Sequence, residues 1–94
     1  MQREEKAVAV GYSGKGEAPK ILAVARGMLV GRLLEIAEEH DITIYRNSDL
    51  AEVLAALEVG SEIPEELFHA VAEVLAYCYA VNERFKEKIE QLDT

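Results

Sequence analysis

Short apolar runs in the first part of the chain predict strands. Residues 7–10 (Ala-Val-Ala-Val), followed by Tyr12, are apolar on both faces of an extended chain, as in a strand that is covered on both sides. A loop rich in glycine, serine and charged residues at 13–17 separates them from a second apolar run at 21–25. The short connection predicts two antiparallel neighbours.

A helix and a further strand are predicted next. Gly27 ends the second run, and residues 28–40 then place apolar side chains at helical spacing, opposite acidic ones: Leu29, Leu33, Ile36 and Ala37. Residues 42–46 alternate between apolar and polar and predict a third strand. The order strand, helix, strand favours a parallel, right-handed crossover from the second strand to the third.

The rest of the chain is predicted to be helical. Residues 47–49 (Asn-Ser-Asp) offer helix N-caps, and Asp49 and Glu52 have the spacing of a capping-box variant. A short helix is expected to follow, with apolar residues at Leu50, Val53, Leu54 and Leu57. The last helix is predicted to begin near Pro64, because proline has no N–H to leave unpaired in a first turn.

The last helix is apolar around most of its circumference. One stripe consists of Leu67, Val71, Val74, Cys78, Val81 and Phe85, and a second one beside it of Phe68, Ala72, Leu75 and Tyr79. So wide an apolar surface must be covered by the sheet, by another helix or by a partner. Beyond Asn82 the chain becomes charged, which predicts a projecting helical tail.

Together these elements predict an α/β domain. We expect a small mixed sheet of about three to four strands, packed with about three helices, the last of them long. We expect a flexible N-terminus at residues 1–6, a domain at 7–82 and the charged helical tail at 83–94.

Composition narrows the class of protein. The chain has 94 residues, half of them apolar, and 18 acidic residues against 10 basic ones give a formal charge of −8. This balance argues against nucleic-acid binding, which needs a basic patch. No apolar run approaches the roughly 20 residues of a membrane span, and the charged N-terminus does not resemble a signal peptide. With a single cysteine, a cytoplasmic protein without direct membrane insertion is expected.

Candidate chemistry is sparse. His69 and Glu73 share a helix face, but two ligands do not make a metal site, and a solvated pair is the simpler interpretation. His40 suits a helix C-terminus, and Cys78 lies on the apolar stripe as a small core residue. No base is placed near a nucleophile, so we predict no enzyme, no catalytic residues, no metal and no cofactor.

Several segments resemble, in the same order, the cytoplasmic domain of the FlhB/YscU family, the switch proteins of flagellar and type III secretion export machines. Residues 18–27 (Ala-Pro-Lys-Ile-Leu-Ala-Val-Ala-Arg-Gly) resemble the family's Ala-Pro-Lys strand. Residues 36–40 (Ile-Ala-Glu-Glu-His) resemble its first helix. Residues 59–60 (Val-Gly), 63–67 (Ile-Pro-Glu-Glu-Leu) and 70–77 (Ala-Val-Ala-Glu-Val-Leu-Ala-Tyr) are the most specific match. The resemblance covers roughly residues 7–80.

The resemblance implies a docking function. Ala18 and Pro19 by themselves fit a loop, and Ala72 and Leu75 fit a helix core. In the family, the matching small apolar positions form a shallow patch that docks apolar motifs of export substrates. The resemblance therefore implies a non-enzymatic component of flagellar or type III protein export, with substrate binding at Ala18, Pro19, Ala72 and Leu75. It implies as partners rod- and hook-type substrates and export gate proteins, and a peripheral position at the export apparatus on the inner face of the membrane.

The chain also departs from the family pattern. The self-cleaving Asn-Pro-Thr-His sequence is absent, so autocleavage does not carry over. The strand that precedes this motif in the family is missing as well, which leads us to expect a free-standing equivalent of the C-terminal cleavage product, with an open strand edge at residues 7–12. An alternative is a structural protein that keeps the fold without the switch role and forms a homodimer through that edge or a helix.

Overall fold

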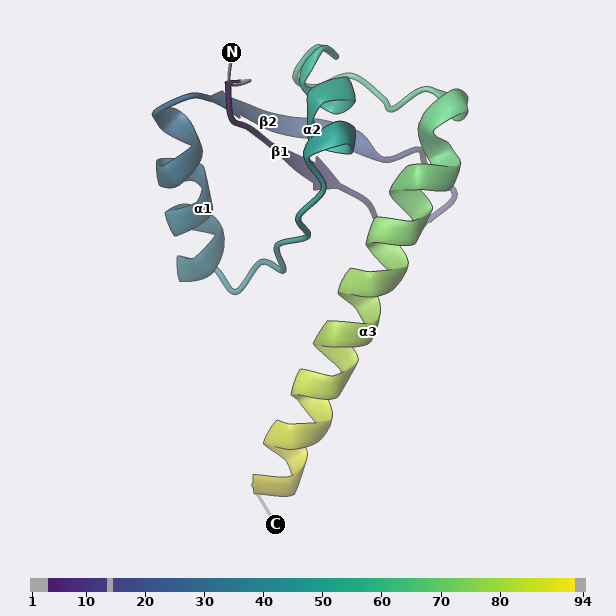
Figure 1. Cartoon of the computed structure of the whole chain (residues 1–94). Coiled ribbons are helices and arrows are strands. Elements are labelled where there is room, and N and C mark those ends of the chain that lie inside the picture. The colour runs from purple at the N-terminus through teal and green to yellow at the C-terminus, as the bar shows by residue number, and fades with distance from the viewer. Residues whose placement is uncertain (1–3, 14, 93–94) are drawn as a thin grey trace.

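The computed structural model of the protein describes residues 4–13 and 15–92. Its elements in chain order are β1 (Lys6–Gly11), β2 (Lys20–Arg26), α1 (Leu29–Glu39), α2 (Ser48–Ala55), a short 3-10 turn η1 (Glu65–Leu67) and α3 (Phe68–Leu92). Figure 1 shows the two strands with α1 and α2 beside them and the long α3 extending away from the rest. The predicted α/β class with a long C-terminal helix is confirmed.

The two strands pair as predicted. β1 is antiparallel to β2, with Lys6 opposite Arg26 and Gly11 opposite Lys20. The register shifts between Ala9 and Val10, so β2 contributes one extra residue to the pair. A bulge of this kind bends the strand and increases its twist.

The predicted third strand is wrong, and with it the parallel crossover and the count of three to four strands. Within the described residues the sheet has two strands, and residues 42–47 form no ladder. They run along α3 instead, where Thr43 Oγ1 donates to Asn82 Oδ1 over 2.8 Å. The Tyr45 ring meets the edge of the Tyr77 ring at a centroid distance of 5.1 Å. Alternating apolar and polar residues predict an extended segment with one buried face. Here that face packs against the helix α3 rather than against a neighbouring strand.

A different segment extends the sheet. The N–H of Gly60 donates to the Ile21 carbonyl (2.6 Å), the Ile21 N–H donates to the Ser61 carbonyl (3.0 Å), and the Ile63 N–H donates to the Pro19 carbonyl (2.8 Å). Gly60 has a φ of +89°, which residues with a side chain rarely adopt. The glycine thus permits the turn that brings residues 60–63 onto the outer edge of β2.

The core lies between this sheet, α2 and the first part of α3. Four buried residues form its centre: Ile21, Leu54, Ile63 and Val71. Partly buried apolar residues pack around them: Val8, Val10, Val24, Leu50, Leu57, Leu67 and Leu75. α1 contacts both strands, and its buried residue is Val30, while the predicted core residue Leu29 is 65% exposed. The other predicted residues of this face, Leu33, Ile36 and Ala37, are half-buried, so the prediction fails only at the first turn.

Polar contacts fix α2 against the strands. The Lys6 ammonium lies 2.7 Å from Glu52 Oε1, and this lysine side chain is only 12% exposed. On β2, the Arg26 guanidinium donates to the Ala55 carbonyl at the last residue of α2 (2.8 Å). Glu52, which we expected in a capping box, thus contacts β1.

Asn47 caps α2, as one of the three predicted cap residues. Its Oδ1 accepts a hydrogen bond from the Leu50 N–H over 3.0 Å. Replacing Asn47 by alanine is expected to lower the free energy of unfolding by about 1 kcal/mol, because the N–H loses its partner. Asn47→Ser retains an accepting oxygen and should cost much less. Urea unfolding of both variants checks this, and equal losses would contradict a capping role.

The entry to α3 differs slightly from the prediction. Pro64 is extended, with φ −63° and ψ 151°, and it caps η1, after which α3 begins at Phe68. The division into residues 1–6, 7–82 and 83–94 stays a prediction. Residues 1–3 and 93–94 lie outside the described residues, β1 begins at Lys6, and α3 runs without a break to Leu92.

Candidate docking site

A hollow of about 650 Å³ lies between the loop before β2 and the segment that leads into α3. Its lining consists of Gly16, Glu17, Ala18, Glu62, Ile63, Pro64, Glu65 and Phe68. The hydrogen bond from the Ile63 N–H to the Pro19 carbonyl ties its two walls together. The hollow is therefore a product of the same pairing that places residues 60–63 on β2.

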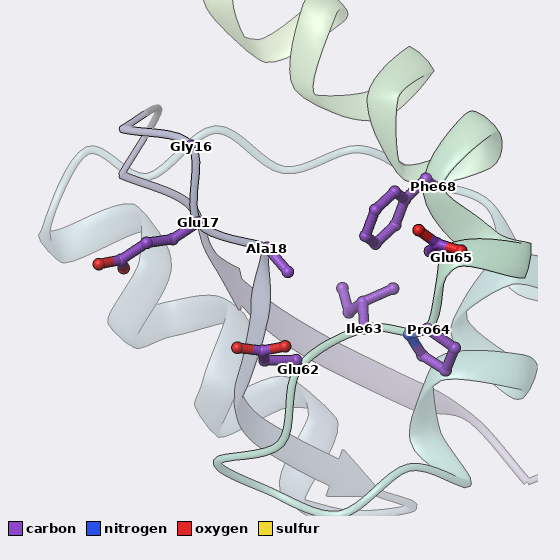
Figure 2. A pocket seen from close by; sticks show the side chains of 8 residues that line it. All are labelled: Gly16, Glu17, Ala18, Glu62, Ile63, Pro64, Glu65 and Phe68. Atoms are coloured by element: carbon purple, nitrogen blue, oxygen red, sulfur yellow. The ribbon is translucent and has the colours of Figure 1, made fainter.

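Apolar side chains lie at the centre of the hollow, although polar atoms make up most of its exposed lining. Figure 2 shows the side chains of Ala18, Ile63 and Phe68 pointing toward one another, whereas the Glu17 carboxylate points away. Ile63 is 2% exposed and belongs to the core, and Phe68 is 38% exposed at the first residue of α3. The volume is within the range of roughly 300 to 1,000 Å³ that is usual for ligand sites. The hollow has room for large apolar side chains of a partner.

The four predicted site residues have different positions relative to the hollow. Ala18 is half-buried and lines it. Pro19 is buried beneath it and supplies the carbonyl that holds Ile63. Ala72 is exposed one turn of α3 beyond Phe68, and Leu75 is half-buried and packs against the core. The structure thus brings Ala18 to the start of α3, and it places Ala72 and Leu75 outside the lining, on the helix that leads away from it.

Sequence reasoning missed most of the lining. Ile63 and Pro64 were recognised as part of a specific motif, and Phe68 as part of an apolar stripe, but none of them was assigned to the site. The three glutamates of the rim, Glu17, Glu62 and Glu65, were missed as well. The sequence does contain a signal for Phe68, because Phe68 and Ala72 are four residues apart and therefore share one helix face.

The lining of the hollow combines carboxylates with apolar side chains. Its eight lining residues include three carboxylates but no histidine, cysteine, serine or lysine. Among the described residues, no group of three or more potential ligands is placed to hold a metal ion. The site has no nucleophile with an adjacent base, which covalent catalysis would need.

The other singled-out side chains lie elsewhere. His69 Nε2 is 3.5 Å from Glu73 Oε1, and with side chains 94% and 69% exposed they form the solvated pair expected. His40 Nδ1 is 2.9 Å from the Ile36 carbonyl at the end of α1. Burial raises the pKa of the Cys78 thiol, which disfavours the reactive thiolate.

Neither α3 nor any shorter helix in the described part of the chain is long and apolar enough to cross a membrane.

Comparison with known proteins defines the class. The family described as FlhB HrpN YscU SpaS matches residues 4–78. The chain belongs to this FlhB/YscU family, which confirms the resemblance predicted for residues 7–80.

Individual relatives fall into two sizes. The Bacillus subtilis uncharacterized protein YlqH is 32% identical over 84 residues, which cover 88% of this chain and 90% of YlqH. The flagellar biosynthetic protein FlhB of Yersinia enterocolitica is 44% identical over 75 residues, and that of Aquifex aeolicus is 40% identical over 73. These matches cover 78% and 76% of this chain. The chain spans only 20% and 21% of the length of these two FlhB proteins.

Proposed function

We propose that this chain is a non-enzymatic docking component of flagellar or type III protein export. It binds short apolar segments of export substrates, or of the export gate, at a surface formed by Ala18, Ile63, Phe68, Ala72 and Leu75, called the docking surface below. The observation that carries the proposal is the group of apolar side chains at the centre of the hollow, where Ala18 meets Ile63 and Phe68.

Family membership supports the export role. The relatives from Yersinia enterocolitica and Aquifex aeolicus are named flagellar biosynthetic proteins. The hollow is formed by residues 16–18 and 62–68, which fall within the matched residues 4–78. We infer that the docking surface is the part of the family's function that this chain carries.

The size of the surface supports weak, reversible binding. Burying one large apolar side chain of a partner contributes about 1.5 to 3 kcal/mol, and ordering an unfolded segment offsets part of this gain. Interfaces that bury only a few side chains are typical of transient complexes. An export component needs such binding because each substrate must be released before the next one docks.

A binding titration tests the proposal. Fluorescent segments of rod- and hook-type subunits and the cytoplasmic part of the export gate are titrated with the chain, and anisotropy is recorded. We expect saturable binding with a dissociation constant in the range of roughly 1 μM to 1 mM. If neither partner class binds, and if a deletion strain swims normally, the proposal is wrong.

A second candidate function is self-association through β1. Ile21, which lies opposite Val10, directs both its backbone N–H and its carbonyl to residues 60 and 61. The backbone groups of Ile21 thus point away from β1, so those of Val10 opposite it point away from β2. Every second residue of a strand points the same way, so the backbone groups of Val8 also lie on the side of β1 that faces away from β2. Among the described residues, β2 is the only strand paired with β1. Such an edge supports pairing with a second copy.

A matched pair of variants tests this edge. Val8→Pro removes the outward N–H, and Val8→Ala removes similar core volume but retains that N–H. If the chain dimerises through β1, light scattering should give a monomer for Val8→Pro and a dimer for Val8→Ala. A monomeric wild-type chain, or equal dimer fractions in the two variants, would exclude self-association through this edge.

A further inference from the structure

The hollow carries an excess of negative charge at its rim. Three of its eight lining residues are glutamates, and none is a lysine or an arginine. Glu62 and Glu65 flank the Ile63-Pro64 pair on one wall, and Glu17 comes from the loop on the other wall. The carboxylates beside the apolar side chains are therefore those of Glu62 and Glu65, because the Glu17 side chain points away from the hollow.

Within the described part of the chain, these carboxylates are not in salt bridges, although Lys15 stands in the same loop as Glu17. All three glutamates are exposed. Lys20 is the nearest basic residue by pairing, since it lies opposite Glu62 in an isolated β-bridge, but it does not line the hollow. Charge of one sign around a concave site attracts ligands of the opposite sign.

Helix stability explains only part of this charge. Glu65 lies in the first turn of η1, where the positive end of the helix dipole favours a carboxylate. Glu17 lies in a loop, and Glu62 lies in the bridge that precedes Pro64, so neither occupies a helix end. Helix stability therefore does not account for the negative charge of Glu17 and Glu62 at the hollow.

We propose that the hollow selects apolar segments that carry a lysine or arginine beside the docked residue. This inference rests on the proposed docking function and names its substrate class. In an extended segment, successive residues are about 3.3 Å apart and point to opposite sides. An apolar side chain at the centre of the hollow, between Ala18 and Phe68, therefore leaves the neighbouring basic side chain at the rim. There Glu62 and Glu65, which flank the Ile63-Pro64 pair, lie beside it.

The charge of the partner decides the selectivity. An acidic flank would place a like charge beside Glu62 and Glu65, which is unfavourable, and a neutral flank would gain nothing at the rim. Exposed ion pairs are individually weak, so two of them give a preference of about three- to tenfold. Salt should reduce this preference, because the Debye length falls to about 3 Å near 1 M ionic strength.

Peptides with one apolar core and different flanks test the inference. Anisotropy is recorded for a lysine-flanked, a glutamine-flanked and a glutamate-flanked peptide at low salt and at roughly 1 M salt. We expect the lysine peptide to bind about three- to tenfold more tightly than the glutamine peptide at low salt, and the glutamate peptide to bind most weakly. Equal affinities overturn the charge selectivity but leave docking intact, whereas no binding of any peptide overturns the docking proposal itself.

Variants of the rim provide the second readout. The double variant Glu62→Gln with Glu65→Gln should bind the lysine- and glutamine-flanked peptides with equal affinity. Glu66→Gln is the matched control, because Glu66 is exposed beside Glu65 but does not line the hollow. Circular dichroism verifies that each variant is folded. A preference for lysine that persists in the double variant, or that disappears in the control, would contradict the assignment to this rim.

Discussion

Replacing Ile63 by alanine is expected to lower the free energy of unfolding by about 2 to 5 kcal/mol. Ile63 is 2% exposed and packs in the centre of the core with Ile21, Leu54 and Val71. Truncation removes buried methyl groups and leaves a cavity where the sheet, α2 and α3 meet. Small domains are stable by only about 5 to 15 kcal/mol, so this loss is a large part of the total.

Urea unfolding followed by circular dichroism measures this effect. The matched control is Val59→Ala, four residues earlier, because Val59 is 62% exposed. The control should change the free energy of unfolding by less than about 0.5 kcal/mol. Similar losses in both variants would mean that residues 60–63 do not dock onto β2 as described.

Replacing Ala72 by aspartate is expected to weaken the docking of apolar segments by about tenfold or more. Ala72 is exposed, so the fold should tolerate the carboxylate. In the complex, however, the carboxylate would have to give up water against an apolar side chain without a partner, which is costly. The stripe of Phe68 and Ala72 would then repel the segments that it binds.

Ala80→Asp provides the control for this variant. Ala80 is exposed on the same helix, but it lies about 120° around the helix axis from Phe68. It should bind peptides as the wild-type chain does, with an unchanged unfolding midpoint. Equal weakening by both aspartates would indicate a general effect of charge on α3, and no weakening by Ala72→Asp would remove Ala72 from the docking surface.

The spacing of apolar and polar residues predicted most helices and strands, because this spacing depends on residues close together in the sequence. The apolar runs at 7–10 and 21–25 became β1 and β2, and the helical spacing from residue 28 onward became α1. Asn47 caps α2 as expected. Residues 42–46 failed as a strand because alternation reports partial burial, and Tyr45 obtains that burial from Tyr77 on α3.

The site was harder to predict than the elements. Ala18 was found through a family resemblance, but its neighbours depend on a pairing between residues about forty apart in sequence, at Pro19 and Ile63. No local pattern encodes that pairing, although the positive φ of Gly60 helps to make it. The hollow, its phenylalanine and its acidic rim follow only once residues 60–63 are placed on β2.

The most direct test of the docking function is a two-dimensional NMR titration of the chain with an apolar segment of an early export substrate. We expect amide signals of residues 16–18 and 62–75 to shift together and to saturate at one dissociation constant. Signals of β1 and α1 should stay in place. Shifts confined to β1, or saturable binding that leaves the signals of Ala18, Phe68 and Ala72 unchanged, would show that the docking surface is not the binding site.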